Sequence, residues 1–390
     1  MLQALREFRI GRPQIFAGLL LLAFLVQCLW VASGRKLSDL EYEYILSGYR
    51  TAAPVLRVKS PFTSVMAALP TQVVSALKSV APQSAKESLG VPRRWVVRLP
   101  FVIFGVWLGG ALWWVARRLF GNRGGYVALA LYCLSPAMVM ISSNIGPEII
   151  LAWSSFGLIY TAIGVAHTTY APPRKWVPRI VILGTAIGIC LSTTLWAATV
   201  VVLAFAFMWY LSPGRRRVAL VVLLCASILG VAILCLVNWI AGASLLGGRA
   251  LITPQLTREL ITNLGFIFAE AYWLPNHLAF TIAMQGLLIV LMVTALTTYG
   301  SWARARYFGN TAALMTAFTI VLLFALVPTL HLWFATLGLS FTFLFIGGIA
   351  ADLVETRWQR VITVSLAAIL AIKAVLDLSL LYGWIHQNLI

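Results

Sequence analysis

Charged residues are scarce in this sequence. They make up 10% of the 390 residues, against roughly 25% in soluble domains. Apolar residues make up 61% and come in blocks of about 15 to 23, close to the length that crosses a bilayer as a helix. The short alternating segments that mark membrane β-barrels are missing. These features exclude a soluble globular protein and predict an all-α polytopic membrane protein.

Several motifs are also missing. The 5 cysteines all lie in apolar blocks and form no C-x-x-C pair, which argues against a zinc site or a disulfide framework. The sequence has no P-loop, no dinucleotide fingerprint and no G-x-S-x-G. The net charge of +18 is concentrated in short loops between apolar blocks, so membrane topology explains it and no nucleic acid is expected.

The apolar blocks predict about 11 membrane spans in one transmembrane domain, residues 1–390, with no soluble C-terminal domain. The first block is longer than the apolar core of a signal peptide and is interpreted as a retained span. Every loop predicted to be cytoplasmic is rich in Lys and Arg, which places the N-terminus inside and the C-terminus outside. The predicted spans are 14–34, 98–116, 125–142, 147–166, 178–192, 196–211, 218–239, 277–298, 311–328, 330–350 and 360–382.

Two longer loops are predicted on the outer side. Residues 35–97 form the first periplasmic loop and residues 240–276 the second. Helical spacing of apolar residues within 39–50 and 61–80 predicts two juxtamembrane helices that lie in the interface plane.

Three of the 11 acidic residues gather at the start of the first outer loop: Asp39, Glu41 and Glu43. Carboxylates at a membrane surface beside basic groups suit general-base work or metal coordination. On a helix, Asp39 and Glu43 share a face, whereas Glu41 points away, toward the side of Ile45. The alternative is a solvated surface turn.

Further candidates lie at the outer ends of spans. Glu148 follows Pro147 at the start of a span, where it is either a functional acid or a helix cap. Two pairs of basic residues lie in or beside the first outer loop. They could bind a phosphate, or they could only anchor the chain at lipid head groups. These pairs are Arg57 with Lys59 and Arg94 with Arg98. His331 lies at a predicted outer turn, where a lone histidine is more often an interfacial anchor.

The order of these features resembles the GT-C glycosyltransferases, in particular bacterial enzymes similar to protein mannosyltransferases and lipid A aminoarabinose transferases. Family motifs are matched over about residues 14–210, and a later segment, HLWFATLGLSF, is similar to a region of the family that carries a basic residue, here His331. The matching segments are LEYEY (40–44), KSPF (59–62), RLP (98–100), RRLFG (117–121) and the turn that holds Glu148.

The resemblance implies a membrane enzyme that moves a sugar, with inversion, from a polyprenyl-phosphate carrier to an acceptor at the outer face of the bacterial inner membrane. An acid of the first loop would act as base, Glu148 would be the second acid, and Tyr44 and the basic side chains would bind substrate or phosphate. The lipid-linked sugar donor and membrane lipids are the expected partners, and the acceptor is unknown. The resemblance implies no certain cofactor, and dependence on a divalent cation stays open. In the family motif, however, the leading acid falls on Leu40. The alternative is therefore a catalytically inactive subunit of the same fold, a scaffold or lipid-binding partner in a membrane complex.

Overall fold

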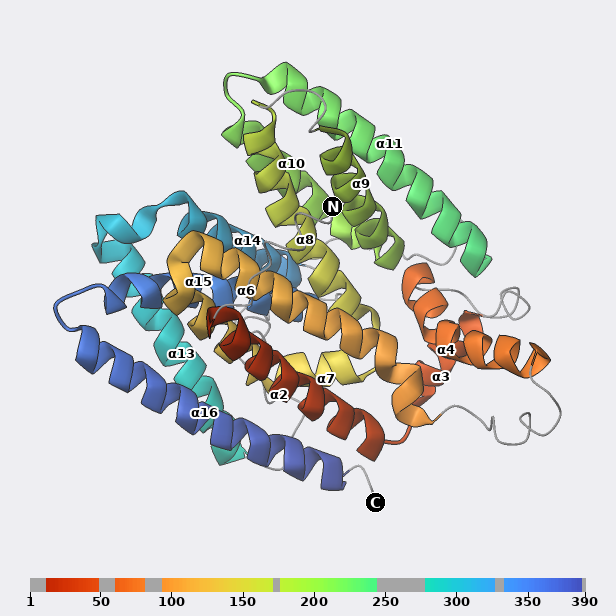
Figure 1. Cartoon of the computed structure of the whole chain (residues 1–390), viewed down its shortest axis with the longest axis horizontal. Coiled ribbons are helices and arrows are strands. Elements are labelled where there is room, and N and C mark those ends of the chain that lie inside the picture. The colour runs from red at the N-terminus through yellow and green to blue at the C-terminus, as the bar shows by residue number, and fades with distance from the viewer. Residues whose placement is uncertain are drawn as a thin grey trace.

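A computed structural model describes residues 12–48, 60–80, 93–170, 176–243, 278–326 and 333–387. Within these ranges every regular element is a helix, and the helices pack side by side in a bundle (Figure 1). The elements are α2 (Arg12–Gly34), α3 (Asp39–Ser47), α4 (Pro61–Val80), α6 (Arg94–Cys133), α7 (Pro136–Ser143), α8 (Pro147–Thr168), α9 (Trp176–Thr193), η2 (Leu195–Ala197), α10 (Ala198–Leu211), α11 (Arg216–Ala241), α13 (Leu278–Ser301), η3 (Ala303–Arg306), α14 (Phe308–Leu326), α15 (Trp333–Val354) and α16 (Gln359–Gln387).

The expectation of an all-α, multi-pass membrane protein is confirmed. Among the described residues, 7 helices are long and apolar enough to cross a membrane, and three shorter apolar helices accompany them. The long ones lie within α2, α6, α8, α9, α11, α15 and α16. The predicted span 125–142 is divided between the end of α6 and α7. The count of about 11 spans stays a prediction.

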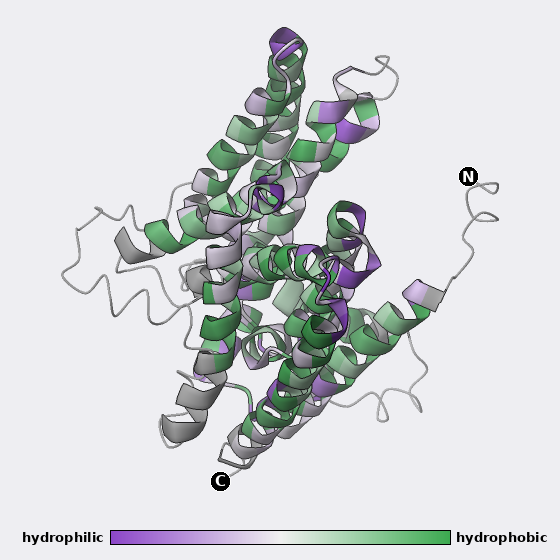
Figure 2. Cartoon of the chain, turned by 90° about the vertical axis from the view of Figure 1, so that its left-hand side faces the viewer, coloured by the Kyte–Doolittle hydropathy of each residue, from purple (hydrophilic) through white to green (hydrophobic). Residues whose placement is uncertain are grey.

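The apolar side chains of many helices face outward. Figure 2 shows long helices that are mostly hydrophobic, with hydrophilic residues gathered near their ends. Of the residues in the most apolar stretch of each helix, 89% are buried in α15, 28% in α11 and 11% in α16. Helix α15 therefore forms the centre of the bundle, whereas α11 and α16 present their apolar surface to lipid.

Helix α6 reverses direction at Gly121, where φ is 74° and ψ is −175°. Its two arms then lie side by side: the Tyr132 hydroxyl donates a hydrogen bond of 2.7 Å to the Gly105 carbonyl. Gly125 similarly lies against the backbone of Arg117. The positive φ at Gly121 is open to glycine and costly for other residues, because a Cβ would crowd the peptide groups on either side, although no other part of the described structure lies within 4 Å of it.

The turn at Gly121 gives a direct test of the fold. We expect Gly121→Ala to lower the free energy of unfolding by about 1–3 kcal/mol, the usual cost of a residue forced into such a conformation. Gly110→Ala is the matched control, since it lies in the same helix with nothing within 4 Å of an added Cβ. Unfolding in a mixed-detergent titration measures both, and equal stability of the two variants would contradict the assignment of the turn.

Arginines gather with aromatic rings at one end of the bundle, which we call the arginine end. It comprises the Gly121 turn, the 212–217 connection, η3 and the connection between α15 and α16. The Gly121 turn contacts the end of η3 through Phe120 and Tyr307, whose ring centroids are 5.7 Å apart. Arg304 of η3 forms an ion pair with Glu355 of the α15–α16 connection. Guanidinium groups lie 5.2–5.8 Å from ring centroids in the pairs Arg117–Trp113, Arg118–Trp114, Arg215–Tyr170, Arg216–Trp209, Arg304–Trp302 and Arg357–Trp358.

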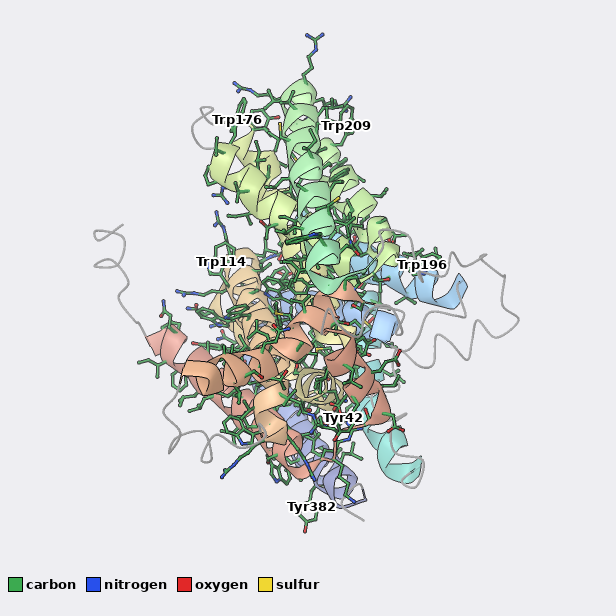
Figure 3. All side chains as sticks on the ribbon, turned by 90° about the vertical axis from the view of Figure 1, so that its right-hand side faces the viewer. Tyr42, Trp114, Trp176, Trp196, Trp209 and Tyr382 are labelled. Atoms are coloured by element: carbon green, nitrogen blue, oxygen red, sulfur yellow. The ribbon has the colours of Figure 1, made fainter. Side chains whose placement is uncertain are left out.

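The opposite end, which we call the Glu41 end, holds α3, the start of α6 and the turn before α8. Arg98 and Gly121 are 23 residues apart on the first arm of α6, a helical rise of about 35 Å and enough to span a bilayer. Figure 3 places Tyr42 and Tyr382 at one end of the molecule and Trp176 and Trp209 at the other. Aromatic rings at both ends of apolar helices are typical of the two membrane interfaces.

The two helices expected within 39–50 and 61–80 are present as α3 and α4. Helix α4 packs against α3, α6, α9 and α11. Its buried face consists of small residues, and the Ser64 hydroxyl lies 2.8 Å from that of Ser47 on α3. Leu69 and Val73, on the apolar stripe read from the sequence, are 41% and 49% exposed. The later part of this stripe is therefore exposed, whereas Phe62 and Met66 at its start pack against the core.

Candidate functional site

The centre of the Glu41 end is a buried ion pair. Glu41 is 3% exposed and Arg98 is fully buried. The guanidinium binds the carboxylate in a two-pronged arrangement, with Nε donating to Oε1 at 2.9 Å and Nη2 to Oε2 at 2.7 Å. Because the pair joins α3 to the first turns of α6, it fixes the juxtamembrane helix on the bundle.

The remaining donors of Arg98 bind the chain that leaves α2. Nη1 donates to the carbonyl oxygens of Ala32 at 2.8 Å and Arg35 at 3.0 Å, and Nη2 donates to that of Lys36 at 3.0 Å. All five N–H groups of the guanidinium are therefore in use. No donor is left for a phosphate in this arrangement.

The carboxylate of Glu41 is equally occupied. Oε1 accepts a 3.0 Å hydrogen bond from the backbone N–H of Ile145, and Oε2 accepts one of 2.8 Å from that of Ser38. The Ser38 hydroxyl in turn caps the N–H of Glu41, which completes a capping box at the start of α3. The bond to Ile145 ties Glu41 to the turn before α8, three residues from Glu148.

Electrostatics at Glu41 follow from these contacts. Burial alone would raise the pKa of the carboxyl, but Arg98 and the two backbone N–H groups outweigh burial and hold the pKa below its ordinary value. Glu41 is therefore ionised at neutral pH, and it stabilises the folded state as a carboxylate.

This shift predicts a loss of stability in acid. A folded-state pKa below the ordinary 4.5 means that the contribution of Glu41 is complete above about pH 4.5 and declines as the pH falls toward the lowered value. We expect the parent to be more stable than Glu41→Gln near neutral pH, with the difference shrinking below about pH 4.5. Unfolding of both proteins across this range measures it; a difference that grows in acid would contradict the sign.

Glu148 lies in the first turn of α8, after Gly146 as N-cap and Pro147 at the first helical position. It is half-buried, and its carboxylate hydrogen-bonds its own backbone N–H. The side chain folds over Gly146, where a Cβ would overlap a carboxylate oxygen. Its charge and that of Glu41 lie close enough to interact.

Tyr44 lies within electrostatic range of both acidic segments. It lies on α3, partly buried, and burial raises the pKa of its hydroxyl, as do the negative charges of Glu148 and Glu43. The phenol thus stays protonated and lies near both carboxylates. We call Glu148, Tyr44 and Glu43 the acidic group; it lies at the Glu41 end beside the Glu41–Arg98 pair.

The other predicted site residues are placed as follows. Asp39 is exposed at the start of α3, so the expectation that Glu41 points away from it is confirmed. Arg94 is exposed one turn before Arg98. Arg57, Lys59 and His331 lie outside the described residues. In the part of the chain that is described, no three His, Cys, Asp or Glu side chains gather to hold a metal ion, and the divalent cation stays a prediction.

Two features of this site were missed from the sequence. The pattern Ser38-Asp39-Leu40-Glu41 fits a capping box, which would have predicted that Glu41 turns back toward its own helix start. The hydrogen bond of 2.5 Å from Arg35 to the Asn144 side chain, which holds the same turn, had no signal in the sequence because it joins residues 109 apart.

The fold matches known membrane glycosyltransferases. Residues 87–240 match the model of the family "Dolichyl-phosphate-mannose-protein mannosyltransferase". The structure is similar to that of ArnT from Cupriavidus metallidurans in the apo state, with TM-score 0.60 and 14% identity over 97% of this chain and 77% of that one. It is also similar to ArnT from Cupriavidus metallidurans bound to undecaprenyl phosphate, with TM-score 0.57 and 13% identity over 96% of this chain and 76% of that one.

A more distant similarity is to the Archaeoglobus fulgidus oligosaccharyltransferase tethered to an acceptor peptide, with TM-score 0.51 and 13% identity over 93% of this chain and 55% of that one. No curated protein matches the chain in sequence. The fold is that of the GT-C glycosyltransferases, and the resemblance predicted from the motifs is confirmed.

Proposed function

We propose that the chain is a glycosyltransferase that moves a sugar from a polyprenyl-phosphate carrier to an acceptor, with inversion, at the outer face of a bacterial inner membrane. The observation that carries the proposal is the acidic group at the Glu41 end of a GT-C fold. The similar ArnT structure bound to undecaprenyl phosphate supports a lipid-linked donor. The excess of arginine at the opposite end supports a cytoplasmic location for that end.

Glu148 is the proposed base. Among the described residues its carboxylate has no ion-pair partner, whereas that of Glu41 is fully occupied. In the reaction, the oxygen of the acceptor hydroxyl attacks the anomeric carbon, and Glu148 takes the proton of that hydroxyl. The bond from that carbon to the phosphate oxygen breaks on the opposite face, and the electron pair leaves with the lipid phosphate. A single displacement of this kind inverts the anomeric centre.

Negative charge accumulates on the departing phosphate, so cations belong there. Arg94 is exposed at the Glu41 end and is the proposed phosphate ligand from the described residues. Arg57 and Lys59 are proposed for the same role from the first outer loop. Tyr44, as a protonated phenol, is proposed to donate a hydrogen bond to the substrate.

Glu41 and Arg98 are proposed as positioning residues. Their contacts hold the end of α2, the start of α3 and the turn at Ile145 in one arrangement. Since Glu148 follows that turn by three residues, the pair sets the position of the base without touching substrate.

A second candidate function is the inactive membrane subunit. Leu40, at the position of the leading acid in the family motif, is 62% exposed at the Glu41 end. An exposed leucine there supplies neither a base nor a metal ligand. It favours a chain that keeps the fold and binds lipid or a protein partner in a complex.

One assay separates the two candidates. The purified chain is reconstituted with radiolabelled polyprenyl-phosphate sugars, hexosyl and pentosyl, and with a membrane extract as the source of acceptors. The enzyme proposal expects loss of label from the donor with stoichiometric release of polyprenyl phosphate. No turnover with any donor would favour the inactive subunit.

A further inference from the structure

The connection between α7 and α8 is short and stiff. It consists of Asn144, Ile145 and Gly146, and Pro147 opens α8. Proline fixes its own φ and restricts the residue before it to extended backbone, and Gly146 is extended, with φ −163° and ψ 164°. Few torsions are therefore free between Asn144 and Glu148, so a displacement of Asn144 is carried along the chain to Glu148.

Arg35 binds this connection from the end of α2. Its Nη1 donates a hydrogen bond of 2.5 Å to the side-chain oxygen of Asn144, which lies 109 residues further along the chain. Both side chains are half-buried, so water competes with this bond less than it would at the surface. The bond fixes the start of the connection relative to α2.

Arg98 links this bond to the buried ion pair. It donates a hydrogen bond of 3.0 Å to the carbonyl oxygen of Arg35, and it binds the carboxylate of Glu41. Glu41 in turn accepts the N–H of Ile145. Two successive residues of the connection are thus bound, Asn144 by Arg35 and Ile145 by Glu41. Without the Arg35 bond, the connection would keep its contact at Ile145 and could pivot about that point.

The carboxylate of Glu148 lies against the same connection. Its side chain folds over Gly146 so closely that a Cβ there would overlap a carboxylate oxygen. We propose that Arg35 and Asn144 are positioning residues for Glu148. They fix the connection, and through it the carboxylate that takes the proton of the acceptor, without touching substrate. This role rests on the proposed function, because it requires Glu148 to be the base.

Steady-state transfer by the reconstituted full chain tests the proposal, with release of polyprenyl phosphate as the rate. A small misplacement of a catalytic group can slow a reaction by about 10²-fold. We therefore expect Asn144→Ala and Arg35→Gln each to lower kcat by about 10–100-fold, with less than about a twofold change in KM for the lipid donor. Asn144→Asp keeps an acceptor for the Arg35 guanidinium, and the charge-assisted bond should keep kcat within about threefold of the parent.

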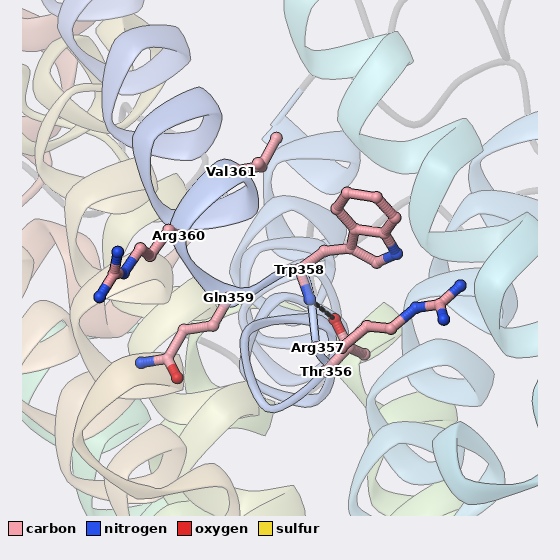
Figure 4. Close-up of a pocket in the computed structure, with 6 residues that line it drawn as sticks. All are labelled: Thr356, Arg357, Trp358, Gln359, Arg360 and Val361. Atoms are coloured by element: carbon pink, nitrogen blue, oxygen red, sulfur yellow. Dashed lines mark hydrogen bonds between the residues drawn. The ribbon is translucent and has the colours of Figure 1, made fainter.

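Arg360→Gln is the control for Arg35→Gln. It removes the same charge from an exposed side chain at the arginine end. Figure 4 shows Arg360 on the opposite side of the α15–α16 connection from Arg357, pointing away from it. We expect the kcat and KM of this variant to equal those of the parent.

Hydrogen exchange gives a readout that does not require the reaction. In the parent the Ile145 N–H is bound to Glu41, and looser backbone exchanges faster. We expect the peptide that contains residues 144–148 to exchange faster in Asn144→Ala than in the parent, and Asn144→Asp to exchange like the parent. Equal exchange in all three would overturn the role of the Arg35–Asn144 bond.

The kinetic outcomes separate this role from the function on which it rests. An active parent whose kcat is unchanged in Asn144→Ala would overturn the positioning role and leave the function standing. A fall in kcat that Asn144→Asp shares, or a rise in KM of the same size, would also overturn it. A parent without turnover would overturn the function, and the positioning role with it. Should Arg35→Gln fail to accumulate, the two Asn144 variants carry the test, because they leave every arginine in place.

Discussion

Replacing Arg98 by glutamine is expected to lower the free energy of unfolding by about 3–5 kcal/mol, the usual cost of breaking a buried ion pair from one side. The change leaves the carboxylate of Glu41 buried at 3% exposure without its cation. It also removes the donors that bind three carbonyl oxygens at the end of α2. Both losses act on the same junction, and the backbone N–H groups of Ser38 and Ile145 that still bind Glu41 carry no full charge to replace the guanidinium.

Arg94→Gln is the matched control for this change. It removes the same charge one turn earlier in the same helix, but at an exposed position, where substitutions usually change stability by no more than about 0.5 kcal/mol. Mixed-detergent unfolding at neutral pH measures both variants. Equal stability of the two would contradict the structural role of Arg98. Should Arg98→Gln fail to accumulate, Glu41→Gln carries the test, because its amide keeps one acceptor oxygen and lowers stability by a smaller amount.

These two arginines also show how far the sequence could predict the structure. Long apolar blocks predicted most of the helices, because burial in lipid requires continuous apolar length whatever the tertiary contacts are. Arg94 and Arg98 were equivalent in the sequence, since both lie near the start of a span on one helix face. Their difference depends on which part of α6 the end of α2 covers, and this contact joins segments more than 60 residues apart.

The same reasoning applies to the acids. Helical spacing correctly separated Glu41 from Asp39 and Glu43, because the side of an isolated helix is fixed by local geometry. Spacing could not tell which of the two sides faces the protein. The capping-box pattern at Ser38 was the one local signal that Glu41 is used structurally. The proximity of Tyr44 to Glu148 arises because Glu41 on α3 binds the backbone of Ile145 in the turn before α8, and no pattern in either segment predicts it.

The largest effect on activity is expected from Glu148→Gln. If Glu148 is the base, the amide cannot accept the proton of the acceptor, and the transfer rate should fall by about 10²–10⁴-fold. The fold should be retained, because in the described structure the carboxylate has no ion pair to lose and a glutamine fits the same space over Gly146. Glu148→Asp keeps a base but draws it back by one methylene, so an intermediate rate is expected.

The rate is measured as release of polyprenyl phosphate from the labelled donor, with protein stability followed in parallel. Glu355→Gln is the control, since it exchanges an acid for an amide on an exposed side chain at the arginine end. Glu43→Gln locates the base within the acidic group. If its rate falls as far as that of Glu148→Gln, the base lies on α3 and the assignment to Glu148 is wrong. If the parent itself transfers no sugar and Glu148→Gln changes only lipid binding, the enzyme proposal is wrong. The exposed Leu40 at the position of the family's leading acid would then indicate a chain that has kept the fold and lost the reaction.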